Sequence, residues 1–303
     1  MKKVISLLLV LVLVCSFAGC MKTEKQNNKL SIIATLFPQY DFCREIAGDK
    51  ADVTLLLPPG SESHSFEPTT SDVMKINQAD AFIYTGDNME AWAKQIIESV
   101  QNENLTVLDI SDKITMINSE DEHGHHENEI DPHIWTSPVN AQIIVNEIAD
   151  MLIKIDSANS DYYRKNADNY IVKLKNLDKQ IREVVANGKR KEVIFGGRCA
   201  LLYFLKEYDL EFMSAYDSCS MDADPSASTL KEITDRIKAN KIPVIYYEEL
   251  SDPKVGRALA KETGTELLLF HSAHNVSKED FDKGVSYLSI MEQNVENLRK
   301  GLS

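Results

Sequence analysis

Residues 160–187 read SDYYRKNADNYIVKLKNLDKQIREVVAN, a stretch that contains neither proline nor glycine. Its apolar residues recur at steps of three and four, from Tyr163 and Ala167 through Leu174 to Val184. This spacing places them on one stripe of an α-helix. At a rise of 1.5 Å per residue, such a helix would be roughly 40 Å long. The sequence therefore predicts one long amphipathic helix in the middle of the chain.

Short apolar runs with the composition of β-strands flank this helix, four before it and four after it. Several are apolar throughout, which is typical of strands in a parallel sheet that is covered on both faces. Helix-like segments separate most of them, as in repeated β-α units. The runs are 30–37, 51–58, 81–86, 105–110, 192–197, 210–216, 242–249 and 265–272. This order predicts an α/β lobe, the long helix and a second α/β lobe.

The first residues of the chain carry the features of an export signal. Lys2 and Lys3 precede the apolar run ISLLLVLVLV, which is too short to span a bilayer comfortably. The box FAGC at 17–20 resembles a bacterial lipoprotein cleavage site. This resemblance implies cleavage before Cys20 and lipid on its sulfur, with an ordinary signal cleaved nearby as the alternative. The polar segment that follows, up to residue 29, is typical of a short tether.

Charge and cysteine content narrow the classes of partner and site. The net charge is −14, and it becomes −16 when the two lysines of the signal are removed. An acidic surface argues against nucleic acid as a partner, because phosphates need lysine and arginine, and it is compatible with cations. After the signal and Cys20, only Cys43, Cys199 and Cys219 remain. They form no closely spaced metal cluster, and Cys199 with Cys219 is the disulfide that we would expect.

Three of the seven histidines lie in one acidic segment. Residues 117–130 read INSEDEHGHHENEI and contain His123, His125 and His126. The segment has no apolar period, so we expect a loop. Short histidine-rich tracts can bind metal, which makes secondary metal capture one interpretation. A merely solvated acidic loop is the other.

The other four histidines follow or flank predicted structured elements. His64 follows the second apolar run in PPGSESHSFEPTT, and His133 lies in IDPHIWTSP. His271 and His274 lie in LLLFHSAHN, directly after the last run. In open parallel sheets, ligands bind outside the carboxyl ends of the strands, and imidazole suits zinc. A lone histidine is more often solvated or structural, but two at matching strand ends favour a shared metal site between the lobes.

Five motifs together resemble a known family. HSFEPTTSD, DPHIWTSPVNA, DPSASTLKEI, YYEEL with KETG after it, and GVSYLSIMEQNVENLRKGL are similar to segments of zinc/manganese-binding (cluster A-I type) solute-binding lipoproteins of bacterial metal ABC transporters. The resemblance runs from about Leu30 to the C-terminus. It implies two lobes, each with a four-stranded parallel sheet flanked by helices, joined by one long helix, with the metal between them. The expected parts are a signal peptide (1–19), a lipid-anchored tether (20–29), an N-terminal metal-binding lobe (30–159), a linking helix (160–188) and a C-terminal metal-binding lobe (189–303).

The metal ligands can be carried over position by position. His64 and His133 match the first two histidine ligands of the family. Arg198 stands where the third ligand, histidine or glutamate, is usual, and arginine cannot ligate because it stays protonated. His271 stands after the last strand, where aspartate or glutamate is usual. His274, a nearby carboxylate or water would complete the set.

The departure from the family pattern at Arg198 leads to two expectations. Three neutral imidazoles favour zinc over manganese, which prefers harder oxygen ligands, so Zn²⁺ is the expected ion and Mn²⁺ the alternative. A cation beside this site needs a counter-charge, and we expect Arg198 to pair with Glu248 or Glu249 at the end of the seventh run. A different ligand, such as a metal chelate or an anion, stays open.

The resemblance implies binding and delivery rather than catalysis. A monomeric receptor, held outside the cytoplasm on the bacterial cell membrane by lipid on Cys20, would pass Zn²⁺ to the membrane permease of an ABC transporter. A secreted zinc hydrolase is the alternative from another class, since three histidines and a water also form a catalytic arrangement. The sequence contains neither HExxH nor GxSxG. Nothing in it separately supports adhesion to a host surface.

Overall fold

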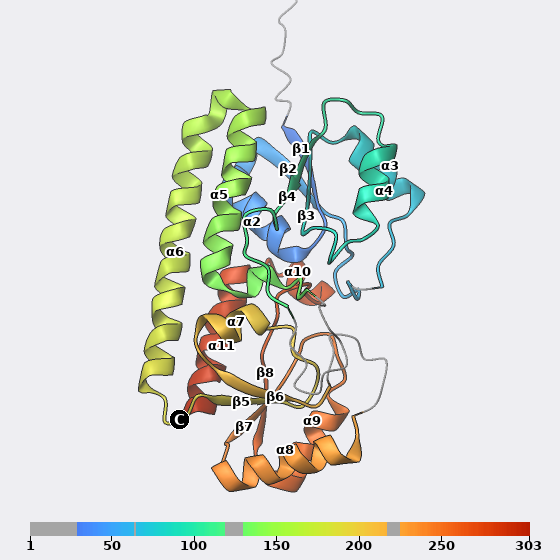
Figure 1. The fold of residues 1–303 in the computed structure, drawn as a ribbon. Helices are drawn as coiled ribbons and strands as arrows, with labels where there is room; N and C mark the ends of the chain where they lie inside the picture. Colours follow the sequence, from blue (N-terminus) through green and yellow to red (C-terminus); the bar gives the residue numbers. More distant parts are fainter. Residues whose placement is uncertain (1–28, 64, 119–129, 217–224) are drawn as a thin grey trace, which may run out of the picture.

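The structure is a computed structural model, and it describes residues 29–63, 65–118, 130–216 and 225–303. Two α/β lobes lie one above the other, and the long helix α6 (Ser160–Asn187) runs along the side of both (Figure 1). The predicted bounds of this helix are confirmed. Its stripe, which includes Tyr163, Leu174 and Val184, is buried.

The N-terminal lobe is built on a four-stranded parallel sheet with the order β2-β1-β3-β4. Helices α2 and α5 cover one face of this sheet and α3 and α4 the other (Figure 1). The strands are β1 (Leu30–Ala34), β2 (Ala51–Leu55), β3 (Ala81–Tyr84) and β4 (Thr106–Asp109). The helices are α2 (Phe37–Ala47), η1 (Gly48–Lys50), α3 (Thr70–Gln78), α4 (Ala93–Ser99), η2 (Ile134–Thr136), α5 (Pro138–Ile155) and η3 (Ser157–Asn159).

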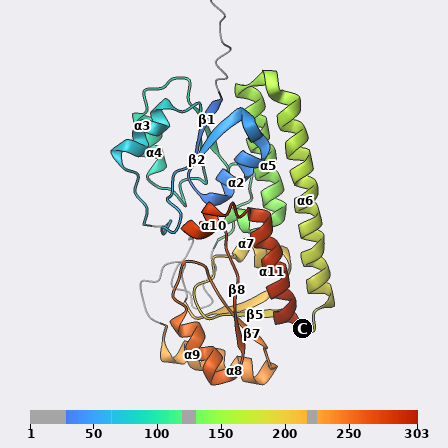
Figure 2. The ribbon, with the colours of Figure 1, turned by 180° about the vertical axis from the view of Figure 1, so that it is seen from behind.

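The C-terminal lobe repeats this plan with the order β6-β5-β7-β8, again all parallel. Helix α11 packs against α6 (Figure 2), and α8 and α9 cover the outer face of the sheet. The strands are β5 (Glu192–Phe195), β6 (Glu211–Ser214), β7 (Val244–Tyr247) and β8 (Glu266–Leu269). The helices are α7 (Leu202–Glu207), α8 (Ala227–Asn240), α9 (Lys254–Thr263), α10 (Lys278–Asp282) and α11 (Tyr287–Leu302).

All eight predicted strands form, and each is shorter than its apolar run. The last run was expected to extend to residue 272, but β8 ends at Leu269. Each run continues past the last residue of its strand, so its final residues leave the sheet at the carboxyl edge. His271 therefore lies in a loop beyond β8, not at the end of the strand.

Helix caps fix the loops that precede two of the helices. The Ser137 hydroxyl accepts hydrogen bonds from the amides of Val139 and Asn140 and begins α5, directly after the His133 segment. Thr69 and Asp72 form a reciprocal capping box at the start of α3. The Thr69 hydroxyl accepts a hydrogen bond from the amide of Asp72 (3.3 Å) and so caps the helix.

One apolar cluster extends through both lobes. It joins β1, α2, α5 and α6 to β5, α7, β7 and α11, and it includes the fully buried side chains of Trp135 and Tyr287. Hydrogen bonds follow the same path: the Tyr287 hydroxyl donates to the Trp135 carbonyl oxygen (2.7 Å), and the Tyr287 amide donates to Asp41 Oδ2 (2.8 Å). The lobes thus share a core. Within the described ranges, no helix combines the length and apolar character needed to cross a membrane.

Candidate metal centre

The segment after β8 crosses from the C-terminal lobe to the N-terminal lobe. The Phe37 amide donates to the His274 carbonyl oxygen (3.3 Å), and the Gly60 amide donates to the Val276 carbonyl oxygen (2.8 Å). The Asn275 side chain donates to the carbonyl oxygens of Pro58 and Ser61, both at 2.9 Å. The loop after β2 is therefore tied to the loop after β8, at the carboxyl edges of both sheets.

His133 is buried and its ring is held by a carboxylate. Asp131 Oδ1 accepts a hydrogen bond from the His133 amide (2.7 Å) and lies 2.9 Å from the ring Nδ1. The carboxylate holds the proton on Nδ1, so the lone pair is on Nε2. This carboxylate–histidine arrangement is the one that orients metal-binding imidazoles.

His274 has the same arrangement from the other lobe. Its Nδ1 lies 2.7 Å from Ser272 Oγ and 3.0 Å from Glu249 Oε1, and the residue is 3% exposed. Glu249 also accepts hydrogen bonds from the amide and the hydroxyl of Ser272 (2.8 and 2.7 Å), which fix its position. The His274 Nε2 atom is buried and has no hydrogen-bond partner in the described part of the chain. An unsatisfied buried nitrogen of this kind calls for an explanation such as an ion.

His271 differs from His274 in the role of its Nδ1. The Ala273 amide donates a hydrogen bond to His271 Nδ1 (2.9 Å), so this atom carries the lone pair and Nε2 carries the proton. Glu249 Oε1 is also 3.2 Å from Nδ1. A hydrogen bond between these two atoms would need a proton on Nδ1, but Nδ1 already accepts the hydrogen bond from the Ala273 amide. Ala273 has a positive φ of 62° and is fully buried, and this left-handed turn places its amide against the ring.

Arg198 forms the ion pair that the sequence predicted with one of the two glutamates. Its Nε donates to Glu248 Oε2 (2.6 Å), while Glu249 serves the histidines. Its Nη2 contacts Glu62 Oε2 (3.0 Å) in the N-terminal lobe, a partner that sequence reasoning missed. Burial lowers the pKa of Arg198, but the charges of the two glutamates outweigh burial and raise it, so the arginine stays cationic.

The two adjacent glutamates have pKa values shifted in opposite directions. Burial and the neighbouring charge of Glu249 raise the pKa of Glu248, against the lowering effect of Arg198. Burial also raises the pKa of Glu249, but the contacts of its carboxylate with His271 (3.2 Å) and His274 (3.0 Å) outweigh burial and hold that pKa well below the usual value. Glu249 is therefore the carboxylate that faces the imidazoles.

Several residues that the sequence singled out lie outside the described residues. They are Cys20, His64, His123, His125, His126 and Cys219. The proposed pairing of Cys199 with Cys219 lies outside them for the same reason. The described residues alone contain no group of three histidine, cysteine, aspartate or glutamate side chains that could hold a metal ion.

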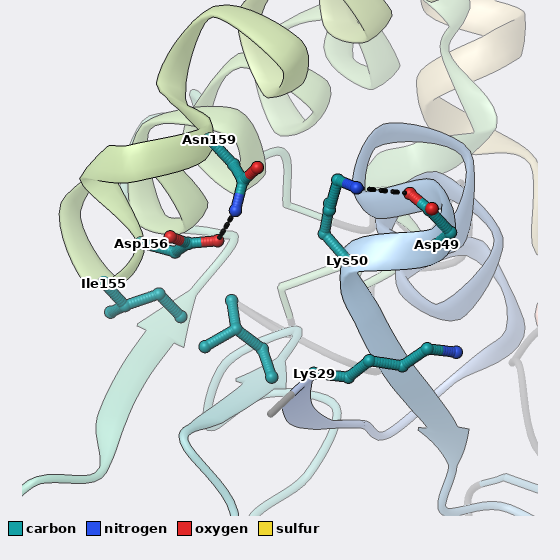
Figure 3. Close-up of a pocket in the computed structure, with 7 residues that line it drawn as sticks. Lys29, Asp49, Lys50, Ile155, Asp156 and Asn159 are labelled. Carbon is teal, nitrogen blue, oxygen red and sulfur yellow. Dashed lines mark hydrogen bonds and ion pairs between the residues drawn. The ribbon is translucent and has the colours of Figure 1, made fainter. Parts of the chain in front are cut away.

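A polar hollow lies at the other end of the N-terminal lobe, beside the start of β1. It has a volume of about 200 Å³ and lies between η1 and the end of α5 (Figure 3). Lys50 pairs with Asp49 (3.1 Å) and Asn159 donates to Asp156 (2.6 Å) at its rim. No histidine lines it, and it is at the amino edge of the sheet, opposite to the edge where the histidines gather.

The structure thus has two parallel α/β lobes with a shared core, one long helix along both lobes, and a buried histidine in each lobe, His133 and His274. These features define a class of two-lobed proteins. The family model described as zinc-uptake complex component A, periplasmic (ZnuA), matches residues 32–301. The chain belongs to this family, and its fold is that of the family.

Relatives and solved structures agree with this assignment. The zinc-binding lipoprotein AdcA of Streptococcus pneumoniae (strain ATCC BAA-255 / R6) is 34% identical over 308 residues, which cover 99% of this chain and 61% of AdcA. The chain thus spans less than two thirds of the length of that relative. The high-affinity zinc uptake system protein ZnuA of Bacillus subtilis (strain 168) is 35% identical, covering 92% of this chain and 89% of that protein. The Zn(II)-bound ZnuA-like domain of Streptococcus pneumoniae AdcA has a TM-score of 0.78 at 33% identity, covering 91% of this chain and 99% of that domain.

Proposed function

We propose that this chain is a zinc receptor that works outside the cytoplasm and delivers Zn²⁺ to the membrane permease of an ABC importer. The observation that carries the proposal is the pair of buried histidines, His133 and His274, one from each lobe, whose Nδ1 atoms are each held by a carboxylate. This arrangement fixes each ring and places its lone pair on Nε2, the atom through which it would bind a metal. The relatives named for zinc binding and zinc uptake support the choice of ion.

The proposed histidine ligands are His64, His133 and His274. His274 is favoured over His271 because its Nε2 is a buried atom with no hydrogen-bond partner in the residues that the structure covers. His271 instead accepts a backbone hydrogen bond on Nδ1, and it would need a rotated ring to offer a lone pair from Nε2. Imidazole donors fit Zn²⁺ better than Mn²⁺, so Mn²⁺ is the alternative cargo.

Metal content and affinity test this proposal. Residues 21–303 would be purified without chelator, analysed for metal, and titrated with Zn²⁺ and Mn²⁺ against a competing chelator. We expect one tightly bound zinc per chain. His133→Ala and His274→Ala should weaken binding by about 100-fold or more, since even partners that only orient a ligand are worth about 10- to 100-fold. His271→Ala should change affinity far less. The absence of zinc binding in the wild-type chain would refute the proposed function.

Delivery and anchoring are further parts of the proposal. The receptor would act as a monomer without catalysis, attached to the membrane by lipid on Cys20, and its protein partner would be the permease. The name of the lipoprotein relative supports the anchor. Cys20→Ala should release the protein from the membrane fraction of expressing cells. A variant protein that stays in that fraction would contradict lipid attachment.

The acidic histidine-rich segment would collect zinc before it reaches the centre. Deletion of 118–129 should slow zinc capture or remove a weaker second site, and it should leave the tight site intact. Uptake at limiting zinc compares the deleted and full-length chains. Equal uptake by both would count against this role.

A further inference from the structure

Four buried side-chain polar atoms have no hydrogen-bond partner among the residues that the structure describes: Gln39 Oε1, Ser63 Oγ, Glu248 Oε1 and His274 Nε2. The last two belong to the candidate metal centre. Both residues are 3% exposed. Glu248 is paired with Arg198, and Oε1 of the next residue in the chain, Glu249, lies 3.0 Å from His274 Nδ1. Buried polar atoms are almost always satisfied by protein, water or an ion. Two such atoms on neighbouring side chains point to one shared partner.

The geometry of Arg198 explains why one oxygen of Glu248 stays available. A guanidinium often takes both oxygens of a carboxylate in a forked pair. Here Nε donates to Glu248 Oε2 at 2.6 Å, Nη2 reaches Glu62 Oε2 across the interface at 3.0 Å, and Glu248 Oε1 has no hydrogen-bond partner among the described residues. An ionised carboxylate has lone pairs on both oxygens. Arg198 therefore fixes the carboxylate through one oxygen and leaves the other.

We propose that Glu248 Oε1 is an oxygen ligand of the bound zinc, beside His274 Nε2, and that Arg198 is a positioning residue that holds this carboxylate. The proposal rests on the proposed zinc-binding function. Mixed histidine and carboxylate coordination is common for Zn²⁺. Arg198 stands where a direct ligand is usual, and it would keep the site functional by holding the carboxylate of Glu248, the residue directly after β7, in place to bind the metal.

Charge supports the same arrangement. A zinc ion held only by neutral imidazoles would place two positive charges near the Arg198 guanidinium in a buried environment, where such repulsion is strong. A Glu248 carboxylate between the two cations offsets both. Glu62 supplies a second negative charge on the far arm of the arginine, so Glu248 does not have to neutralise Arg198 alone.

The test compares Glu248→Gln with Glu62→Gln as a matched control. Both variants remove one carboxylate from Arg198, but only the first removes the proposed ligand. We expect Glu248→Gln to weaken zinc binding by about 100-fold or more, and Glu62→Gln by less than about tenfold. With Co²⁺ as a spectroscopic probe, Glu248→Gln should change the visible absorption bands of the bound ion, and Glu62→Gln should leave them as in the wild type. Equal affinities and equal spectra in the two variants would overturn the proposal.

A crystal structure of the wild-type chain loaded with zinc gives an answer that does not depend on how the variants fold. The expected distance between the zinc and Glu248 Oε1 is about 2.0–2.2 Å. A water molecule as the ligand at that position, or Glu248 outside bonding distance, would overturn the assignment of Glu248 while leaving zinc binding intact. Failure of the wild-type chain to bind zinc at all would refute the proposed function instead, so the two failures are distinguishable.

Discussion

The buried carboxyl of Glu90 should make the stability of the N-terminal lobe depend on pH. Glu90 lies after β3 and is 3% exposed. Thr35 donates to its Oε1 (2.6 Å), and the Thr85 amide donates to its Oε2 (3.0 Å). Burial raises the pKa of Glu90 from 4.5 to about 8, and these hydrogen bonds only partly offset the rise. Glu90→Gln replaces the carboxyl with an amide that resembles the protonated acid and does not titrate.

The size and sign of the effect follow from the two pKa values. Between pH 4.5 and about 8 the folded protein holds a proton on Glu90 that the unfolded chain has released. Stability therefore falls as pH rises through this window, by about 1.4 kcal/mol per pH unit for one proton. From pH 5 to pH 7.5 the contribution of Glu90 to the free energy of unfolding should fall by about 3 kcal/mol. The Gln variant should lack this fall.

Denaturant unfolding of the metal-free protein at a series of pH values measures the effect. The quantity to compare is the difference in unfolding free energy between wild type and Glu90→Gln, because other titrating groups cancel in it. Between pH 5 and pH 7.5, the unfolding free energy of the variant should rise relative to that of the wild type by about 3 kcal/mol. Glu98→Gln, at an exposed position of α4, is the matched control. The reasoning would be refuted if the unfolding free energies of wild type and Glu90→Gln differed by the same amount at every pH in this range.

Three further changes test the packing and the centre. Gly301→Ala would place a methyl carbon 1.9 Å from the Tyr246 hydroxyl oxygen, so the melting temperature should fall and Tyr246→Phe in the same chain should restore part of it. An unchanged melting temperature would contradict the close contact. Leu174→Ala, at a fully buried site of α6, should lower the free energy of unfolding in denaturant by about 2–5 kcal/mol. Val172→Ala, at a position of the same helix that is 57% exposed, should lower it far less. Equal losses in the two variants would argue against the buried stripe. Glu249→Gln should lower zinc affinity in a competition titration by about 10- to 100-fold, because the His274 imidazole loses its charged partner. An unaltered affinity would show that Glu249 does not orient a zinc ligand.

The fold could be predicted because it depends on patterns that are local in the sequence. The stripe of α6 has a clear helical period, and the strands are apolar runs separated by helical segments. The position where each strand ends was less predictable. Apolar residues such as Phe270 continue beyond β8 and are buried in the shared core, so hydrophobicity alone does not mark the boundary.

The site was only partly predictable for a different reason. Asp131 stands two residues before His133 and was visible beside it. Charge at the strand ends predicted that Arg198 pairs with Glu248 or Glu249, and the structure shows which of the two it is. The difference between His271 and His274 depends on the left-handed backbone of Ala273, which is an alanine and carries no sequence signal for that conformation. Glu62 was missed because its contact with Arg198 crosses from one lobe to the other.

The shared core limits how zinc could leave the protein. Pulling the lobes apart would expose apolar side chains of α5, α6 and α11 in one cluster, at a cost of about 25 cal/mol for each Å² brought into water. The loops that carry the proposed ligands are tied more weakly. The loop after β2 meets residues 270–276 through hydrogen bonds from Gly60 and Asn275, each worth about 1 kcal/mol net. Release of the metal by a shift of these loops therefore costs less free energy than release by a hinge motion of the lobes. A metal that joins the two loops would stabilise the folded protein by about 4 kcal/mol when its free concentration is a thousand times its Kd.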